Sequence, residues 1–511
     1  MPSPGPITRG RILKVDLDRF PDEPIHRRIY LSIRRDIVDG LLTPGTHLPS
    51  TRQLSSDLRV ARGTVVIAYD QLRVEGYLEA EVGAGTRVSA HIPDLCIRAE
   101  AGHQPRPRTV ETHGASRRGR AALEEFARGP LDVGAARSPR AFRSTPPAID
   151  VFPVDTWTRI ASRQWRRATT KDLSYGDPMG FLPLRRVIAD YVRSTRGVRC
   201  TAEQILIVSG AQHGMDIAAR ALTEPGDAVW MEDPGYFAIR GVLRSAGARL
   251  VPVGVDFEGI DVTEGKRLAP NARMAFVTPT HQMPLSVPLS ASRRDALLAW
   301  ASEADAWIFE DDYNSDFQYA SRPIAALRAS DREDRVVFCG TFSKSLFPGL
   351  RIAYLVVPES VVREVKAIRF FSDIQPSYID QATLCEFIAD GHYERHIRRL
   401  RSIYQGRREL LFDGLRQCAS WLEPTRHDSG RELTVWLDPR LSDVDVAEAA
   451  ARAGVTVMPL TPWVITHRLA PSLRLGYSGI DEHDISVGVS QLAGALDLVS
   501  RRKGATMPQA S

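Results

Sequence analysis

The sequence predicts an α/β protein with two domains: a small helical domain near the N-terminus and a much larger domain built on a mostly parallel sheet. Three observations support this prediction. A chain of 511 residues is too long for one ordinary core. A stretch rich in Pro, Gly, Ala and Arg, from about 91 to 145, is typical of a flexible linker, within which RAALEEFAR can form a local helix. Beyond it, short apolar runs alternate with helical patterns, as in parallel sheets covered by helices on both faces.

The apolar runs define the large domain in more detail. From about Ile149 onward they are ILIVSG, DAVWMEDPGY, MAFVTPT, DAWIFEDD, VVFCGTFSK and RIAYLVVP. After about Ser377 the pattern is rich in helix, with strands near ELTVWL and LRLGYS. This change predicts a smaller C-terminal α+β lobe beside a large α/β lobe.

Composition limits the class of protein. The chain is 43% hydrophobic and 25% charged, which is typical of a globular protein. It has no apolar run near the ~20 residues that span a bilayer, and its start, MPSPGPITRGRILKV, lacks the apolar core of a signal peptide. Five scattered cysteines without a CxxC pair argue against a disulfide framework or a zinc site. We therefore expect a cytoplasmic protein with no membrane partner.

Arginine is concentrated in the first third of the chain, although the net charge is only +5. One early segment contains Arg27, Arg28, Arg34 and Arg35, and the linker contains Arg98, Arg106, Arg108, Arg117, Arg118 and Arg120. Such segments can bind phosphate. A solvated linker explains them as well, so charge alone does not establish a nucleic-acid partner.

The segment from about 24 to 90 has the pattern of two short helices with a tight turn, preceded by a helix and followed by a hairpin. An apolar stripe defines the first helix, an S-x-x-Q capping box starts the second, and an apolar inner face marks the third. The residues are Ile25, Ile29, Ile33 and Ile37, then Ser50 to Gln53 with Leu54 and Leu58, then Val65, Ala68, Tyr69 and Leu72. YLEAEVGAGTRV predicts the hairpin, a wing with Gly83 and Gly85 at its tip.

The start of the third helix is where a helix-turn-helix enters the major groove. Arg62, Gly63 and Thr64 face outward there, and Arg52 lies near the start of the preceding helix, where it can hold phosphate or a base. For any single arginine, exposure to solvent explains its place on this surface as well as contact with DNA does. The arrangement of helices and wing, rather than the charge, therefore predicts double-stranded DNA as the partner.

The run GLLTPGTHLPSTRQLSSDLRVARGTVVIAYDQLRVEGYLEAEVGAGTRV resembles the winged helix of the GntR superfamily along its whole length. The matching pieces are PGTxLPSxRxLxxxL, RxTVxxAYxxLxxEGYL and GxGTxV. This resemblance implies that the DNA contacts are Ser50, Arg52, Arg62, Thr64, Gly83 and Gly85. Ala61 and Gly63 stand where the family more often has small polar residues, so base contacts are not expected at those two positions.

One segment of the large domain places a lysine beside groups suited to phosphate. Lys344 follows an apolar strand in CGTFSKSLFPGLRIAY, in a chain with very few lysines. Thr341, Ser343 and Arg351 lie close to it in sequence. Taken alone, the segment is explained more simply by a surface lysine whose stem lies along apolar side chains.

Three further segments add groups of the same kind. Asp311 ends a buried strand in WIFEDDYNSDF, with Tyr313 two residues on; paired acids there can hold a metal, or one acid can face a ring nitrogen. The turn Ser209-Gly210-Ala211-Gln212 leads into a helix, so its amides suit a phosphate. Tyr236, in EDPGYF, can stack on a ring or pack as a core aromatic residue. Together the groups fit pyridoxal 5'-phosphate (PLP) better than a metal.

From about Ile149 to about Val499 the chain resembles the fold-type I aminotransferases. The shared pieces occur in the family's order: YGDPMGFLPLR, SGAQHG, EDPGY, TPTHQMP, EDDYNSDF, GTFSKSLFPGLR and LRLGYS. The resemblance implies that Lys344 forms a Schiff base with PLP, that Asp311 faces the ring nitrogen and Tyr313 the ring oxygen, and that Tyr236 stacks on the ring. By the same resemblance, the phosphate group is held by Gly210, Ala211, Gln212, Thr341, Ser343 and Arg351. It also implies a homodimer, because Tyr175 resembles a phosphate ligand from the other subunit. Arg474 matches the residue that clamps a substrate carboxylate.

One departure from the aminotransferase pattern indicates a particular subfamily. Free-standing aminotransferases often have an N-P-x-G motif, whereas here Met283-Pro284-Leu285-Ser286 follows His281-Gln282. The HQxP form is typical of the MocR subfamily of GntR regulators, whose architecture is a winged helix, a linker and an aminotransferase-like domain. On this basis we expect the domains at 22–90, 91–145 and 146–500.

Two functions of different classes are compatible with these motifs. The favoured one is a PLP-dependent transcription regulator that senses a small amine or amino acid, or PLP itself. An amine that displaces Lys344 changes the charge and hydrogen bonding of the pocket, which can bias two arrangements of the domains. The alternative is an active aminotransferase with a DNA-binding appendage, since both functions begin with the same exchange. The sequence does not decide whether catalysis is sustained.

Overall fold

A computed structural model describes residues 15–81, 85–92, 114–129, 141–143, 147–319, 324–425 and 429–502. The chain divides into two compact units, 1–113 and 114–511. Gly83, one of the two glycines expected at the tip of the wing, lies outside the described residues.

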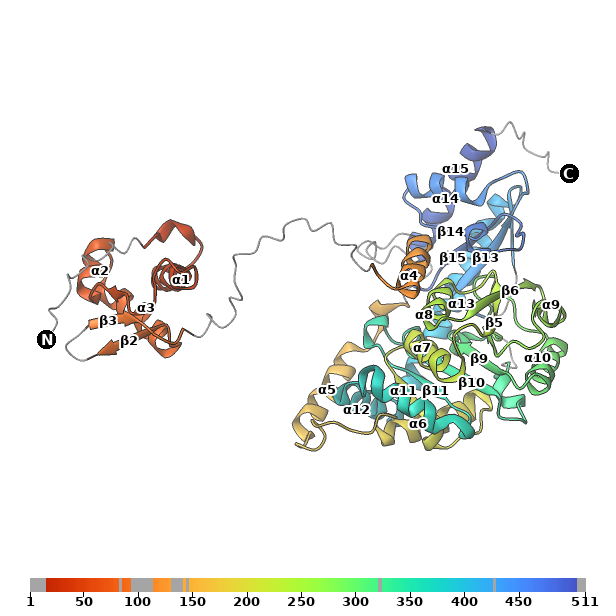
Figure 1. The fold of residues 1–511 in the computed structure, drawn as a ribbon. Coiled ribbons are helices and arrows are strands. Elements are labelled where there is room, and N and C mark those ends of the chain that lie inside the picture. Colours follow the sequence, from red (N-terminus) through yellow and green to blue (C-terminus); the bar gives the residue numbers. More distant parts are fainter. Residues whose placement is uncertain are drawn as a thin grey trace. The chain divides into compact units, whose positions relative to one another are not determined.

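The first unit is a three-helix domain with a small antiparallel sheet (Figure 1). Its elements are α1 (Ile25–Val38), β1 (His47–Leu48), α2 (Thr51–Leu58), α3 (Arg62–Val74), β2 (Leu78–Glu81) and β3 (Gly85–Val88), with strand order β1-β3-β2. Ile29, Ile33 and Ile37 of α1 are buried against Val65 and Leu72 of α3. The apolar stripe therefore packs the helices as expected, although Ile25, at the first position of α1, is largely exposed.

The second and third helices begin where the sequence predicts. The Ser50 side chain caps α2 by accepting a hydrogen bond from the Gln53 amide nitrogen (3.1 Å). The other half of the expected capping box is absent, because the Gln53 side chain donates to Asp57 (2.8 Å) instead of turning back. α2 ends at Leu58, and Arg59, which caps it, lies in the left-handed region (φ +52°) and turns the chain towards α3.

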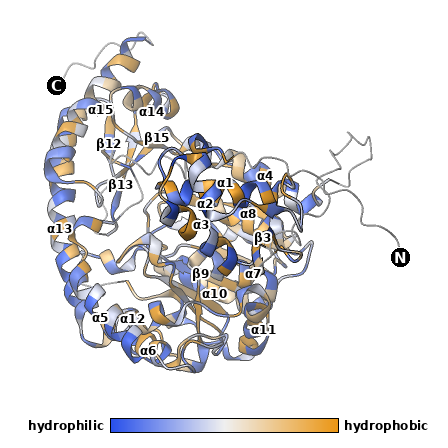
Figure 2. Cartoon of the chain, turned by 90° about the vertical axis from the view of Figure 1, so that its left-hand side faces the viewer, coloured by the Kyte–Doolittle hydropathy of each residue, from blue (hydrophilic) through white to orange (hydrophobic). Residues whose placement is uncertain are grey.

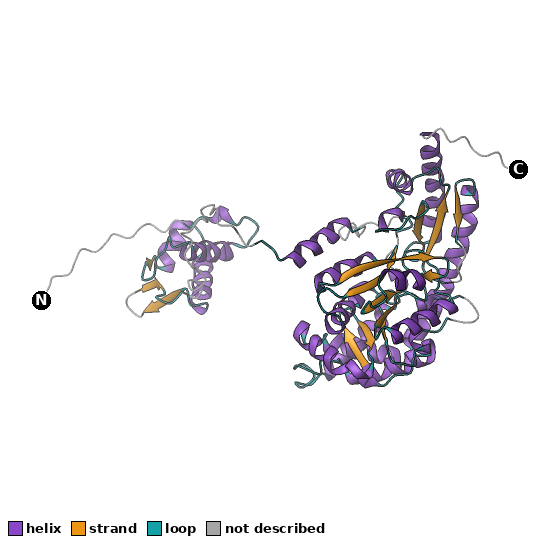
Figure 3. Ribbon diagram, turned by 45° about the vertical axis from the view of Figure 1, so that its right-hand side comes forward, coloured by secondary structure: helices purple, strands orange, loops and turns teal. Residues whose placement is uncertain are grey.

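The second unit contains an eight-stranded sheet with helices on both faces (Figure 3). Its strands are β4 (Ile205–Val208), β5 (Ala228–Asp233), β6 (Arg249–Asp256), β7 (Gly259–Ile260), β8 (Met274–Val277), β9 (Trp307–Asp312), β10 (Val336–Thr341) and β11 (Ala353–Val356). The order is β4-β11-β10-β9-β8-β5-β6-β7. The pairs from β10 to β6 are parallel, whereas β11 and β7 pair antiparallel. The prediction of a mostly parallel sheet is confirmed.

Both faces of this sheet are buried because neighbouring strand residues point in opposite directions. Trp230 of β5 packs among the residues of α9 and α10, whereas Met231 packs with those of α7 and α8. The covering helices are α6 (Leu182–Arg196), α7 (Ala211–Leu222), α8 (Phe237–Ala246), α9 (Val262–Leu268), α10 (Ala291–Glu303) and α11 (Val362–Asp373). Continuous apolar strands such as ILIV and MAFV follow from this double burial.

A smaller lobe follows the large sheet. Its antiparallel sheet has the order β12-β13-β15-β14. The elements of this lobe are α13 (His392–Leu415), β12 (Leu422–Pro424), β13 (Glu432–Leu437), α14 (Asp443–Arg452), β14 (Met458–Pro459), β15 (Ser472–Gly476) and α15 (Glu482–Arg502). Two further helices, α5 (Val154–Arg167) and α12 (Tyr378–Ala389), pack against each other, and α12 also packs against α6. Hydrophilic and hydrophobic residues alternate along α13 (Figure 2), and Tyr393, Leu400 and Leu411 form part of its buried side. The expected α+β lobe is present.

Part of the segment between the two expected domains is packed onto the second unit. α4 (Arg117–Arg128) lies against α8, where Glu125 pairs with Arg244 (3.1 Å) and is largely buried. Phe142 is fully buried and accepts a backbone hydrogen bond from Gly476 (2.8 Å). Both lie within 91–145, so the prediction of a flexible linker does not hold for α4 or for Phe142. The reasons differ: α4 is held through the ion pair of the buried Glu125 with Arg244, whereas its Leu123 and Phe126 stay exposed, and Phe142 is held by burial of its apolar ring.

Candidate functional site

The starts of α2 and α3 each carry an exposed arginine whose charge is not used inside the unit. Arg52 of α2 and Arg62 of α3 are exposed, and in the described part of the chain neither guanidinium group has an acidic or hydrogen-bonding partner. Ala61, before α3, offers no side-chain cap, which leaves the first amides of the helix open. Thr64 is half-buried, and Gly85 takes the left-handed conformation (φ +87°) at the start of β3. The residues expected to contact DNA therefore lie on the outside of this unit, Gly83 excepted because it is not described.

The second unit has a pocket at the carboxyl ends of its parallel strands, the usual ligand edge of such sheets. Asp311 lies near the end of β9, Glu232 near the end of β5, Thr278 directly after β8 and Thr341 at the end of β10. A cavity at this edge is lined by Met215, Met231, Glu232, Gly235, Tyr236, Ile239, Phe276, Val277, Thr278 and Asp311. The sheet thus brings strand ends to one edge although they are more than a hundred residues apart in sequence, as Glu232 and Thr341 are.

Asp311 is a buried carboxylate with an oxygen atom that lacks a hydrogen-bond donor in the described structure. Its Oδ1 atom is buried and, within the described residues, accepts no hydrogen bond. Burial raises the pKa of Asp311 to about 7; the negative charge of Asp312 adds to this effect and Lys344 opposes it. Asp312 differs, because it forms a buried ion pair with Arg196 (2.7 Å). A buried acceptor that lacks a donor fits a cationic N–H from a ligand, as a protonated ring nitrogen would supply.

Lys344 lies three residues after β10 and faces the same region. None of the described residues forms a hydrogen bond or ion pair with its amine. Burial lowers the pKa of Lys344 to about 8, and the positive charges of Arg431 and Arg474 lower it further, while Glu432 and Asp311 act in the opposite sense. A lysine in this state loses its proton far more readily near neutral pH than an exposed lysine does, which suits a nucleophile.

The turn before α7 forms a cradle with Arg351. Gly210 has φ +98°, and a Cβ atom there would lie 2.6 Å from the Arg351 guanidinium, so only glycine fits. Arg351 Nη2 donates to the Ser209 carbonyl oxygen (2.8 Å). Ala211 and Gln212 open α7, and their amides belong to the first turn of the helix. Across the sheet, the Ser343 amide donates to Thr341 Oγ1 (3.2 Å), which orders the segment before Lys344.

Two tyrosines lie near these groups. Tyr236 stands at the N-terminus of α8 and lines the cavity; burial and the negative charge of Asp311 raise its pKa to about 12. Tyr313 donates weakly to Met283 Sδ (3.8 Å) and accepts from Arg474 Nη2 (3.4 Å). The sequence predicted both positions, and the structure places Tyr313 beside the expected carboxylate clamp.

Arg474 is fully buried in β15 and is already engaged. Its Nη1 donates to the Pro284 carbonyl oxygen (2.8 Å), and its Nη2 pairs with Glu432 Oε2 (3.2 Å). Arg431 pairs with Glu432 Oε1 on the other side (3.2 Å). Burial favours a neutral Glu432, but the charges of Arg431 and Arg474 outweigh it and hold its pKa at about 2. Sequence reasoning missed Arg431 and Glu432, whose only signal was a charged pair opening an apolar strand in GRELTVWL.

Tyr175 forms no hydrogen bond or ion pair with this cluster among the residues that the structure describes. It lies in the loop between α5 and α6 and is 80% exposed. Other large apolar side chains on α5, α11 and this loop are also exposed, namely Trp165, Leu173, Phe370 and Phe371.

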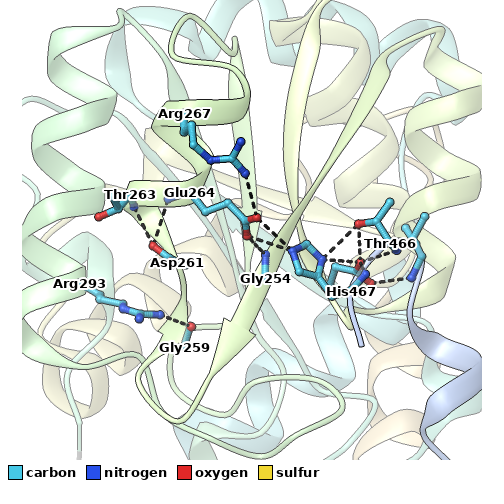
Figure 4. Close-up of polar contacts among 11 residues, drawn as sticks. Gly254, Gly259, Asp261, Thr263, Glu264, Arg267, Arg293, Thr466 and His467 are labelled. Atoms are coloured by element: carbon cyan, nitrogen blue, oxygen red, sulfur yellow. Dashed lines mark hydrogen bonds and ion pairs between the residues drawn. The ribbon is translucent and has the colours of Figure 1, made fainter. Parts of the chain in front are cut away.

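A second polar cluster joins the large sheet to the small lobe (Figure 4). Asp233, the last residue of β5, accepts hydrogen bonds from the amides of Ile465 (2.7 Å) and Thr466 (2.8 Å) and from His467 Nδ1 (2.8 Å). His467 Nε2 meets Glu264 of α9 (3.0 Å). These contacts hold segment 465–467 against β5 and α9, and no sequence motif indicated them.

Comparison with known proteins identifies both units. The family model described as aminotransferase class I and II matches residues 149–492, and that of the bacterial regulatory proteins of the gntR family matches residues 25–88. The probable rhizopine catabolism regulatory protein MocR of Rhizobium meliloti is 37% identical over 482 residues, covering 94% of this chain and 95% of MocR. This chain belongs to the MocR-type GntR regulators.

Two further similarities agree with this family. The pyridoxine biosynthesis transcriptional regulator PdxR of Corynebacterium glutamicum is 31% identical, with 94% of this chain and 98% of PdxR covered. An α-aminoadipate aminotransferase from Thermus thermophilus, solved with N-(5'-phosphopyridoxyl)-L-leucine, has a TM-score of 0.67 and 24% identity over 74% of this chain and 98% of that one. The relatives named as regulators span the whole fusion, which favours a regulator over a free-standing enzyme.

Two other findings complete the site. In the described ranges, no group of three or more His, Cys, Asp or Glu is arranged to hold a metal ion. No helix in the part of the chain that the structure describes has the length and apolar character that a membrane crossing needs.

Proposed function

We propose that this MocR-type chain is a transcription regulator that binds operator DNA through its first unit and PLP through its second, and that a small amine at the PLP site changes its action on DNA. The observation that carries the cofactor assignment is the buried Asp311 Oδ1, which lacks a donor in a region that also holds Lys344. Such an atom fits a pyridinium N–H.

The other groups supply what PLP needs. Lys344 would hold the cofactor covalently, Asp311 its ring nitrogen, Tyr313 its ring oxygen, Tyr236 its ring face, and Gly210, Ala211, Gln212, Thr341, Ser343 and Arg351 its phosphate. When bound, PLP supplies an aldehyde carbon that reacts reversibly with primary amines. Lys344, with its lowered pKa, is then the group that an incoming amine releases, and its charge changes the balance around Arg474 and Glu432.

On the DNA side, the unpartnered Arg62 and Arg52 support contact with base edges or phosphates. Ser50, Thr64, Gly83 and Gly85 complete the expected DNA-contacting set. DNA in a bacterium lies in the cytoplasm, so this function places the protein there.

A homodimer is part of this proposal. The exposed aromatic side chains Trp165, Tyr175 and Phe371 support it, because large exposed apolar and aromatic side chains are enriched at interfaces. Tyr175 would then reach the phosphate group of its partner's pocket. Sedimentation at micromolar concentration should give a dimer, and a monomer that binds PLP normally would contradict the proposal.

Sustained transamination is a second candidate function, which the lowered pKa of Lys344 favours because a catalytic lysine must exchange protons near neutral pH. Turnover with amino acids and 2-oxo acids on the order of 10 per second would support the enzyme. A slow half-reaction combined with a change in DNA affinity would support the regulator.

The cofactor assignment can be tested directly. The full chain is incubated with PLP, reduced with borohydride and digested, and the labelled peptide is identified by mass spectrometry. We expect the label on Lys344, its loss in Lys344→Ala, and its retention in the control Lys366→Ala, since Lys366 is a surface lysine paired with Asp177 (2.9 Å). A label on another lysine, with Lys344 unmodified, would overturn the assignment.

A further inference from the structure

We propose that Glu432 makes this pocket select a primary amine that carries hydroxyl groups in place of an α-carboxylate. Glu432 occupies the side of Arg474 that an amino-acid carboxylate would need. This inference rests on the proposed function, because it assumes that PLP bound at Lys344 receives an amine.

The first step is that Arg474 is not free to clamp a carboxylate. A bidentate clamp needs two guanidinium N–H groups that point to the same side. Arg474 Nη1 is bonded to the Pro284 carbonyl oxygen (2.8 Å) and Nη2 to Glu432 Oε2 (3.2 Å) and Tyr313 Oη (3.4 Å). Within the described residues only Nε lacks a partner. An incoming carboxylate would have to displace Glu432.

The second step is that Glu432 is firmly held. It is 5% exposed and lies between Arg474 and Arg431. Arg431 is itself fixed by Asn314 Oδ1 (3.0 Å) and Ser478 Oγ (3.4 Å). If Glu432 moved aside it would remain a buried carboxylate with half its ion pairs, and two carboxylates beside one another repel. The arrangement therefore disfavours an anionic ligand group at Arg474.

The third step is that the cluster contacts a residue of the proposed cofactor site. Arg474 Nη2 donates both to Glu432 Oε2 (3.2 Å) and to Tyr313 Oη (3.4 Å), and Tyr313 is the residue proposed to hold the PLP ring oxygen. Glu432 is therefore connected through Arg474 to a residue of the cofactor site, on the side where an amine that reacts with PLP would carry its other substituents.

The fourth step is what such substituents would meet. Each carboxylate oxygen of Glu432 accepts one hydrogen bond in the described structure and has capacity for a further one. The neighbouring Asn314 Nδ2 is buried and, over the described ranges, donates to nothing. Thr434, opposite Arg474 in the β13–β15 ladder, shares a 3.4 Å contact with Ser286 Oγ. A hydroxyl group can donate to Glu432 and accept from Asn314, whereas a carboxylate can only accept.

The test compares two amines with the same carbon skeleton, L-alanine and L-alaninol, which differ by a carboxylate and a CH₂OH group. The PLP-loaded full chain is titrated with each, and the change in the cofactor's absorption gives the half-saturating concentration. We expect L-alaninol to saturate at a concentration at least tenfold lower than L-alanine. In Glu432→Gln, which removes the charge and keeps the shape, the preference should fall to parity or reverse.

Glu264→Gln is the matched control, because Glu264 is a carboxylate paired with His467 in the other polar cluster. The Glu264→Gln protein should keep the same preference for L-alaninol over L-alanine as the unaltered chain. Equal or tighter saturation by L-alanine in the unaltered chain would overturn the inference without needing any variant. An unchanged preference in Glu432→Gln would also overturn it. Failure of borohydride to fix PLP at Lys344 would overturn the proposed function and this inference together, whereas a fixed cofactor with the wrong amine preference overturns the inference alone.

Discussion

The second unit contains two buried polar clusters that differ in how completely their atoms are satisfied. In the pocket around Lys344, Asp311 Oδ1, Asn314 Nδ2 and Arg474 Nε have no hydrogen-bond partner in the described structure. In the junction of Asp233, Glu264 and His467, every polar side-chain atom of the three residues is bonded (Figure 4). Buried polar groups are normally paired, so the first cluster is incomplete without a ligand and the second is complete as an internal contact.

The pKa shifts of the two clusters also differ. In the pocket, burial raises the pKa of Asp311 to about 7 and lowers that of Lys344 to about 8, so the neutral form of each group is favoured. In the junction, burial is outweighed by hydrogen bonds, which lower the pKa of Asp233 and raise that of His467, so the charged forms gain. Burial that disfavours the charged form of an ionisable group is typical of a ligand site. In a structural contact, hydrogen bonds and ion pairs stabilise the charged forms instead.

The largest expected effect is at the incomplete cluster. Asp311→Asn should weaken PLP binding about 100-fold, or ~3 kcal/mol, because the amide cannot pair with a positively charged ring nitrogen. The cofactor-free protein should not lose stability, since a buried carboxylate that lacks a donor is replaced by a neutral group. Equilibrium titration with PLP and urea unfolding of the cofactor-free chain measure the two effects. A large loss of stability with unchanged PLP affinity would show that Asp311 is a structural group.

The complete cluster should respond in the opposite way. Asp233→Asn should lower the free energy of unfolding of the second unit by about 2 kcal/mol, because an amide NH₂ would face the backbone N–H groups that now donate to the carboxylate. PLP affinity should change less than twofold. Urea unfolding and PLP titration of the same preparations are the measurements, and a strong loss of PLP affinity at native stability would remove the distinction between the clusters.

The comparison extends to arginines of the first unit. Arg62, which has no partner in the described residues, should lose about tenfold in operator affinity on substitution by Ala, or ~1.4 kcal/mol, if it reads a base. Arg52→Ala should act in the same direction. Arg73, on α3 and paired with Asp70 (3.3 Å), provides the control. Electrophoretic mobility shift at fixed salt measures the affinities, and equal losses for Arg62→Ala and Arg73→Ala would show only a general effect of charge.

Sequence reasoning recovered the fold and the position of several groups relative to the strands. Gly210, Asp311 and Lys344 lie at or just beyond the ends of β4, β9 and β10, as the sequence motifs indicated, and the resemblance to the aminotransferases is what grouped them in one pocket. Their roles towards PLP stay predictions, as do those of the DNA-contacting residues.

Sequence reasoning missed contacts between residues far apart in the chain. Arg474 and Glu432 are 42 positions apart, and His467 and Asp233 are 234 positions apart. Neither pairing leaves a periodic signal, because each depends on how the small lobe packs on the large sheet. The same holds for α4: its pattern indicates a helix, but its docking depends on α8, which lies more than a hundred residues further along the chain.

The smallest expected effect is the pH dependence of the junction. Asp233 and Glu264 raise the pKa of His467 above its ordinary value, despite partial burial that acts in the opposite sense. A histidine whose pKa is higher in the folded state stabilises the fold fully below its unfolded pKa of ~6.5, and this contribution is lost as pH rises through the folded value. His467→Asn should therefore be less stable than the unaltered chain at about pH 6, with a difference that shrinks towards about pH 9. Urea unfolding across this range measures it.

His396 provides a control of opposite sign. Burial lowers its pKa to about 4, and it bonds the Ser345 carbonyl oxygen (3.0 Å) from α13. A histidine whose pKa is lower in the folded state destabilises the fold as pH falls below ~6.5, so the disadvantage of His396→Asn should shrink, not grow, on going from about pH 8 to about pH 5. Parallel trends for the two variants would mean that pH acts on the unit as a whole. Opposite trends would show that the junction around His467 holds a charged imidazolium while the helix core holds a neutral one.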